Sequence, residues 1–135
     1  MPILGVDFGL KRSGLAASDA EDQYALPLET VPTEELLQVI LSLREQEGFE
    51  TIVLGEPISI KGHGNAMTEK VGVFKKELES KAFKVFLMDE RYSSRLALRS
   101  MASAGLRAKK SKKAKDEMAA CIILQDYLDS LNLSS

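Results

Sequence analysis

The stretch "ILGVDFGLKRSGLAASD", residues 3–19, contains an acid, Asp7, inside an apolar run with strand character. Burying an unpaired carboxylate costs several kcal/mol or forces the group to take up a proton. An acid in a strand next to glycine seldom serves packing, because aspartate is depleted in strands. Asp7 is therefore a candidate functional residue, and the basic residues Lys11 and Arg12 follow it closely.

Outward from this stretch, the first third of the chain predicts three strands, at residues 3–8, 13–18 and 24–31. The short connections between them predict an antiparallel meander. Pro27 interrupts the third strand and cannot donate to a ladder, so we expect this strand at an edge of the sheet.

A helix follows, with Thr33 as its expected N-cap and acids in its first turn. Gly48 is expected to end this helix. Its apolar stripe consists of Leu36, Ile40 and Leu43.

Strands and helices alternate in the rest of the chain. We expect a strand at 51–54 and a loop at 55–64, followed by a helix that begins after the N-cap Asn65 and runs through Met67, Val71, Phe74 and Leu78. A strand at 83–88 comes next, and then a helix from Ser93 or Ser94 to 104 that Gly105 ends. A basic linker at 107–115 leads into the last helix, at 116–131. Strands joined through helices pair in parallel. The fold class is therefore α/β, a mixed five-stranded sheet in the order βββαβαβαα, flanked by helices and forming one domain over residues 1–135.

Composition excludes several classes of protein. The net charge of −2 argues against a generally nucleic-acid-coating protein, although it leaves room for a local basic patch. A single cysteine, Cys121, allows no intrachain disulfide, and with a single histidine, His63, no His/Cys zinc set is possible. The chain shows no secretory signal and no apolar run near the roughly 18 residues of a membrane span, so we expect a cytoplasmic protein.

Acids at strand ends suggest a site. Asp7 lies near the end of the first strand, and Asp89 and Glu90 close the last one. In open α/β sheets, ligand sites collect at strand ends. Asp116 begins the final helix, on the same helical face as Ala120, Ile123 and Tyr127, which should pack on the sheet.

Each acid also has a simpler interpretation. Taken alone, Asp116 is better interpreted as an N-cap, and Asp89, Glu90 and Arg91 equally form a solvated turn with an ion pair. Glu56 follows the fourth strand and is either a fourth ligand or a loop residue. The combination favours a site for hard divalent ions such as Mg²⁺, which are bound by carboxylate oxygens, and two such ions about 4 Å apart cleave phosphodiesters.

A basic segment precedes Asp116. The sequence "RAKKSKKAK", residues 107–115, is either a solvated loop or a contact to a phosphate backbone. Lys11, Arg12 and Arg91 lie beside the other acids and suit the same role. The candidate nucleic-acid-binding residues are thus Lys11, Arg12, Arg91, Lys109, Lys110, Lys112 and Lys113. The glycine-rich "KGHGNA", residues 61–66, is interpreted as a loop in which His63 is exposed and not catalytic.

With these motifs in place, the chain resembles the YqgF family of Holliday junction resolvase-like proteins, which are also assigned as pre-16S rRNA nucleases. The matching motifs are "GVDFGLKRSGLAASD", "DERYSS" and "KDEMAACIILQDYL", at residues 5–19, 89–94 and 115–128. The resemblance implies an RNase H-like fold related to RuvC, cofactors Mg²⁺ or Mn²⁺, and Asp7, Glu90 and Asp116 as catalytic acids. It implies Asp89 as a further metal ligand, and Glu56 too, since RuvC-like enzymes place an acid near the end of that strand.

The activity implied by the resemblance is endonucleolytic cleavage of precursor 16S ribosomal RNA. Alternatives are resolution of Holliday junctions, which needs two active sites and hence a dimer, and a non-catalytic RNA-binding module of the same fold. An actin-like ATPase is disfavoured, because 135 residues leave no room for its two large domains. The sequence does not separate RNA from DNA substrates, nor a monomer from a dimer.

Overall fold

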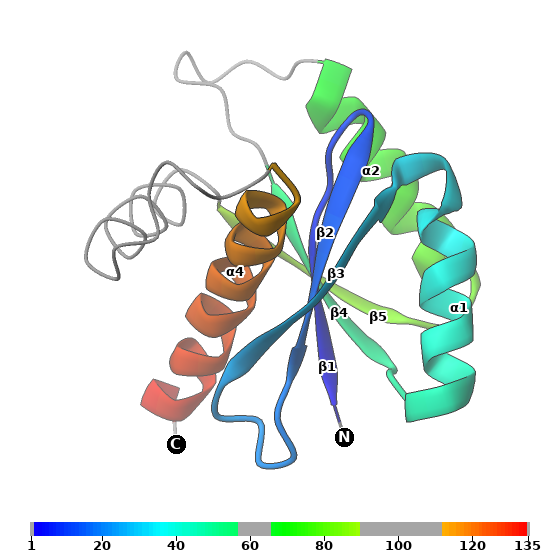
Figure 1. Cartoon of the computed structure of the whole chain (residues 1–135). Helices are drawn as coiled ribbons and strands as arrows, with labels where there is room; N and C mark the ends of the chain where they lie inside the picture. The colour runs from blue at the N-terminus through cyan, green and yellow to red at the C-terminus, as the bar shows by residue number, and fades with distance from the viewer. Residues whose placement is uncertain (1, 57–65, 90–111, 135) are drawn as a thin grey trace.

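The fold is a twisted five-stranded sheet with helices on both faces (Figure 1). The computed structural model describes residues 2–56, 66–89 and 112–134, and gives the backbone alone at 56, 66–67, 89, 112–117 and 132–134. Its elements are β1 (Ile3–Asp7), β2 (Arg12–Ser18), β3 (Ala25–Pro32), the short 3₁₀ helix η1 (Thr33–Glu35), α1 (Leu36–Glu47), β4 (Thr51–Glu56), α2 (Ala66–Ser80), β5 (Lys84–Asp89) and α4 (Lys112–Ser134). The predicted cap at Asn65 and the predicted helix at 93–104 lie outside the described residues.

The strand order β3-β2-β1-β4-β5 confirms the predicted mixed sheet. β1, β2 and β3 pair antiparallel, whereas β4 pairs in parallel with both β1 and β5. The strand that carries Pro27 lies at an edge, as expected for a residue without an N–H to donate. The carboxyl ends of β1, β4 and β5 therefore share one edge of the sheet.

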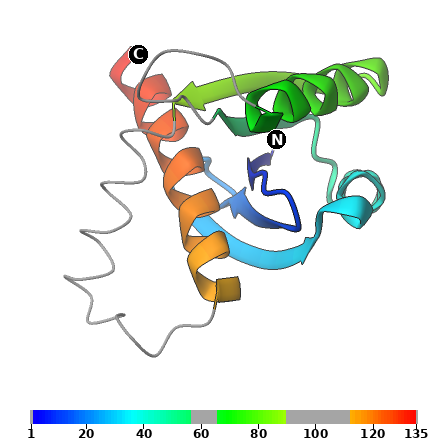
Figure 2. The ribbon, with the colours of Figure 1, turned by 90° about the horizontal axis from the view of Figure 1, so that it is seen from above.

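The two faces of the sheet have separate apolar cores. On one face, α1 and α2 contribute Leu36, Ile40, Val71, Phe74 and Leu78, which pack with Leu4, Val6, Ile52 and Leu54 of the strands. On the other face, α4 contributes Ala120, Ile123, Leu124 and Leu128, which pack with Ile3, Ala16 and Val53. Figure 2 shows α4 on one side of the sheet and α1 on the other.

Several local boundaries differ from the sequence-based expectations, and three of the differences bear on the candidate site. The prediction of Thr33 as a helix N-cap is wrong: no side-chain cap bond is made, Thr33–Glu35 forms η1, and α1 begins at Leu36. β4 continues through Gly55 and Glu56, which were expected in the loop, because both pair with β5. α4 begins at Lys112, so the end of the predicted basic linker is helical.

Gly48 ends α1 as predicted, with a φ of 81° and its N–H donating to the Arg44 carbonyl. Among the described helices, none is long and apolar enough to cross a membrane.

Candidate metal and nucleic-acid site at the strand ends

Three acids occupy the last positions of three adjacent parallel strands. Asp7 ends β1, Glu56 ends β4 and Asp89 ends β5. Val6 pairs with Leu54, and Glu56 pairs with Asp89, so these backbone positions are neighbours along one edge. The structure thus places the backbone of three of the predicted acids at the edge where α/β sheets collect ligands.

Alternation along β1 decides the face on which Asp7 lies. Leu4 and Val6 belong to the core under α1 and α2, whereas Ile3 belongs to the core under α4. Successive strand residues point to opposite faces, so half-buried Asp7 lies on the α4 side, as do Ile3 and Gly5.

The first turns of α4 approach the same edge. A Cβ built on Gly5 would lie 2.7 Å from the Leu124 Cβ and 3.0 Å from the Ala120 carbonyl oxygen, so α4 lies directly against β1. Asp7 lies two residues beyond Gly5, which is about 6.6 Å along β1. Asp116 lies four residues before Ala120, which is about 6 Å along α4. Because α4 runs opposite to β1 (Figure 1), the start of α4 lies toward the carboxyl end of β1, where Asp7 is. The predicted stripe of α4 is confirmed in Ala120 and Ile123, which are buried, and in Tyr127, which packs against that core.

A hydrogen-bonded clamp fixes the turn that follows Asp7. The Thr33 hydroxyl donates to the Gly9 carbonyl (2.7 Å), and the Gly9 N–H donates to the buried Ser13 hydroxyl (3.2 Å). The Ser13 and Thr33 hydroxyls are 2.8 Å apart, and since the Thr33 proton is used on Gly9, Ser13 is the donor between them. The Thr33 N–H also donates to the Lys11 carbonyl at 2.9 Å. These bonds hold the turn rigidly against η1.

Gly9 permits this clamp because the chain folds back on itself there. A Cβ at Gly9 would lie 2.2 Å from the Arg12 carbonyl oxygen, which no side chain tolerates. The sequence-based interpretation missed Ser13 and Thr33, which lie 20 positions apart, and nothing in the local pattern signals their contact. The close contact of α4 at Gly5 did have a local signal, because a glycine inside a strand often marks a place where another backbone approaches closely.

Replacing Thr33 by Val is expected to lower the free energy of unfolding by about 1–3 kcal/mol, because it leaves the Gly9 carbonyl and the Ser13 hydroxyl without their partner. Urea unfolding followed by circular dichroism measures the loss. Thr33→Ser retains the hydroxyl and is the matched control. Equal stability of the Val and Ser variants would show that the clamp contributes nothing.

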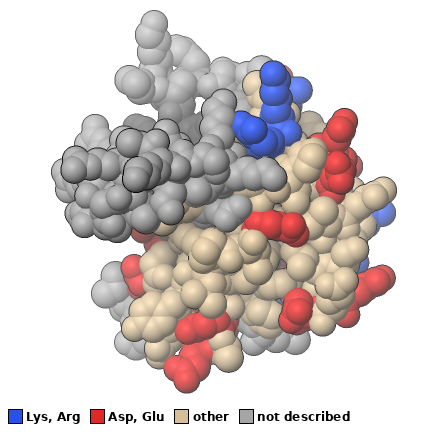
Figure 3. All heavy atoms as spheres, viewed as in Figure 1, with Lys and Arg blue, Asp and Glu red and all other residues tan. Residues whose placement is uncertain are grey.

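The structure describes some of the remaining predicted site residues, which are the basic residues and Glu90, and leaves others out. Lys11 and Arg12 are exposed at the clamped turn, and Lys112 and Lys113 start α4. On the side shown in Figure 3, the visible Lys and Arg side chains gather mainly at one end of the molecule, and Asp and Glu spread over the rest. Glu90, Arg91, Lys109 and Lys110 lie outside the described residues.

Among the side chains that the structure describes, no three His, Cys, Asp or Glu residues form a group able to hold a metal ion. Of the five predicted metal ligands, only the side chain of Asp7 belongs to that described set. The ligand set accordingly remains a prediction.

Asp19 and Tyr127 have shifted pKa values, and both lie away from this edge. Hydrogen bonds from backbone N–H groups, first that of Gln23, lower the pKa of Asp19 in the β2–β3 turn. Burial raises the pKa of Tyr127, which lies about 16 Å along α4 from Asp116. Neither group is placed to act on a ligand at the strand ends.

Comparison with known proteins extends over nearly the whole chain. A family model described as "RuvX: Holliday junction resolvase" matches residues 1–130. A protein of Chlorobaculum tepidum named "Putative pre-16S rRNA nuclease" is 42% identical over 132 residues, covering 95% of this chain and 93% of its own. A protein of Bacteroides fragilis with the same name is 38% identical over 135 residues, covering 97% and 98%.

Solved structures show the same fold. RuvC of Thermus thermophilus, in complex with a Holliday junction substrate, superposes with a TM-score of 0.64 at 18% identity, covering 100% of this chain and 98% of that one. The yeast mitochondrial Holliday junction resolvase gives a TM-score of 0.54 at 11% identity, covering 93% and 77%. The predicted RuvC-like, RNase H-like architecture is thereby confirmed.

Proposed function

Since this chain belongs to the RuvX/YqgF family, we propose that it is a metal-dependent endonuclease that cleaves precursor 16S ribosomal RNA in the cytoplasm. The relatives with the highest identities given above carry the name of a pre-16S rRNA nuclease and align over almost their full lengths. The observation that carries the proposal is that Asp7 and the ends of β4 and β5 lie at one sheet edge, with α4 packed against β1 on the face of Asp7.

The donor chemistry of this edge suits a hard divalent cation. The acids proposed from the sequence offer carboxylate oxygens, and Mg²⁺ and Mn²⁺ prefer oxygen ligands. When bound, such an ion supplies a water of lowered pKa and stabilises the leaving oxygen of a phosphodiester. Asp7 is the ligand for which the structure gives the fullest support, because it is half-buried on the face that α4 covers.

Alternation in β4 and β5 favours some acids over others as partners of Asp7. Phe86 stacks on Tyr127 of α4, and Met88 packs with the core under α4, whereas Val85 packs with the opposite core. Continued one residue past the end of β5, this alternation favours Glu90 over Asp89 as the acid that acts with Asp7 and Asp116. The side chains of β4 alternate in the same way, because Ile52 and Leu54 belong to the core under α1 and α2 and Val53 belongs to the core under α4. This alternation disfavours Glu56 as a metal ligand beside Asp7.

We further propose that the basic residues around this edge bind the phosphate backbone. Lys11 and Arg12 are exposed on a turn fixed by the Thr33 clamp, so they present their charges from a rigid support. Lys112 and Lys113, one turn before Asp116, are proposed to act with them, and Arg91, Lys109 and Lys110 are included from the sequence. Phosphate contacts of this kind position a nucleic acid without reading its sequence.

Resolution of Holliday junctions is the second candidate. The description of the family model and the likeness of the fold to a RuvC solved with a junction favour it. Symmetric resolution requires two active sites and therefore a dimer.

Cleavage of two substrates tests the proposal. Purified protein is incubated with 5′-extended 16S precursor RNA and with a four-way DNA junction, in Mg²⁺, in Mn²⁺ and in EDTA. We expect the RNA to be cut in either metal and to stay intact in EDTA. Faster cutting of the junction would favour the resolvase, and RNA binding without any cleavage would favour the non-catalytic RNA-binding module.

A further inference from the structure

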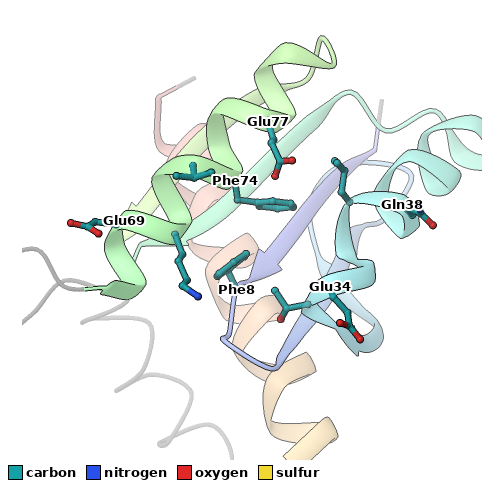
Figure 4. A pocket seen from close by; sticks show the side chains of 10 residues that line it. Phe8, Glu34, Gln38, Glu69, Phe74 and Glu77 are labelled. Atoms are coloured by element: carbon teal, nitrogen blue, oxygen red, sulfur yellow. The ribbon is translucent and has the colours of Figure 1, made fainter.

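A hollow of about 590 Å³ lies between η1 and α1 on one side and α2 on the other. Phe8 and Phe74 lie together in its middle, with ring centroids 5.3 Å apart (Figure 4). Because Phe8 follows Asp7 and belongs to the opposite face, the hollow lies on the side of the sheet away from α4. It is therefore separate from the face on which Asp7 lies.

Part of the wall of this hollow is apolar and accessible. Leu37 of α1 and Val73 of α2 line it together with the two phenylalanines, and Val73 is 64% exposed. Val73 lies on the outer face of α2, where an isolated helix of a soluble protein would usually carry a polar residue. We call this surface, formed by Phe8, Leu37, Val73 and Phe74, the α1–α2 groove.

Acids surround the α1–α2 groove. Among the described residues that line it, Glu34, Glu69 and Glu77 are acidic and Lys70 is basic, and all three glutamates are exposed. Figure 4 shows Glu34 on η1 and Glu77 on α2 on either side of the phenylalanine pair, and Glu69 farther out near the start of α2. A negative rim repels a phosphate backbone and attracts cations, so the groove is unsuited to the nucleic acid that the basic residues of the strand-end site attract.

Spacing along α2 matches a helical ligand. Glu69, Val73 and Glu77 follow one another at intervals of four residues, so they form one stripe about 12 Å long. Two turns of a partner helix span a similar length. Amphipathic helices commonly bind in grooves of this type through apolar anchors.

We propose that the α1–α2 groove docks a basic amphipathic helix of a partner protein. The apolar face of that helix inserts between Val73, Leu37 and the phenylalanine pair, and flanking Lys or Arg side chains pair with the glutamates of the rim. Charge complementarity selects this occupant over an acidic peptide or a nucleic acid.

Two synthetic helical peptides test the proposal, both with leucines along one face, one flanked by lysines and the other by glutamates. Fluorescence anisotropy measures binding to the full chain, and ¹H–¹⁵N shift changes locate it. We expect the lysine peptide to bind at least about tenfold more tightly, since three exposed ion pairs together give about that factor. The shift changes should cluster at Phe8, Val73 and Phe74.

Variants separate the groove from general charge effects. Val73→Asp should weaken binding of the lysine peptide at least about tenfold, because it places a carboxylate in the apolar wall of the groove. The fold should be preserved because Val73 is exposed. Glu69→Lys with Glu77→Lys should reverse the preference between the peptides, whereas Glu45→Lys with Glu47→Lys, exposed on α1 outside the groove, should leave it unchanged.

Equal binding of both peptides, or shift changes elsewhere, would overturn the proposal. So would self-association in sedimentation velocity that Val73→Asp abolishes, because that result assigns the groove to a second copy of this chain. The Val73→Asp variant is expected to cleave RNA as fast as the unchanged protein. Cleavage therefore tests the proposed nuclease function, and peptide binding tests the groove separately.

Discussion

Replacing Asp7 by Asn is expected to lower cleavage of the RNA precursor by more than about 100-fold, because changing even an outer-shell partner of a metal ligand costs about 10–100-fold. Asn has nearly the same shape as Asp, so the half-buried position and the sheet should be retained. Cleavage rates at saturating Mg²⁺ and Mn²⁺ binding by electron paramagnetic resonance measure the effect. Asp129→Asn, at an exposed position on α4, makes the same chemical change away from the site and should be neutral.

The same assay tests the ligand set. Asp116→Asn and Glu90→Gln should resemble Asp7→Asn, whereas Asp89→Asn and Glu56→Gln should retain most of the activity. The expected difference between the adjacent residues 89 and 90 follows from the alternation of β5. Full activity of Asp7→Asn would overturn the proposed site, and inactivity of Asp89→Asn with an active Glu90→Gln would reverse the assignment of the two acids.

Replacing Gly5 by Ala is expected to lower the free energy of unfolding by about 1–3 kcal/mol, as overpacking of a tight core typically does. The added Cβ would lie 2.7 Å from the Leu124 Cβ and 3.0 Å from the Ala120 carbonyl oxygen, so α4 must shift away from β1. Because α4 carries Asp116, we also expect reduced cleavage by the folded fraction. Urea unfolding gives the stability, and cleavage below the transition gives the second effect.

Gly72 provides the matched control for this substitution. It lies within α2, and a Cβ there would meet no atom within 4 Å. Gly72→Ala should therefore be neutral or stabilising by up to about 1 kcal/mol, the difference in helix propensity between the two residues. If Gly5→Ala were as stable as Gly72→Ala, the close contact between β1 and α4 would not constrain the fold.

Patterns between near neighbours in the chain were sufficient to predict most of the architecture. Alternation and short turns predicted the antiparallel β1–β2–β3 meander, and Pro27 predicted the edge position of β3. Helical connections predicted the parallel pairing of β4 and β5. The position of Asp7 at a strand end was predicted in the same way, because the periodicity of a strand and the residues that interrupt it are local properties.

Element boundaries were predicted less well, since they depend on tertiary contacts. Thr33 has the residue type of an N-cap, but its hydroxyl donates to the Gly9 carbonyl, which lies 24 positions away. Glu56 was expected in the loop at 55–64, yet pairing with β5 continues β4 through it.

The sequence by itself determined the order of the elements and the acid at the end of β1, because backbone sterics and apolar periodicity act over a few residues. Only the tertiary structure decided that Asp7 lies on the α4 side of the sheet and that α4 packs closely against β1 at Gly5. It also decided that Ser13 and Thr33 clamp the turn after Asp7, and that α1 and α2 leave an acidic-rimmed groove between them. These features depend on contacts between residues far apart in the chain, which form only when the two cores pack on the sheet.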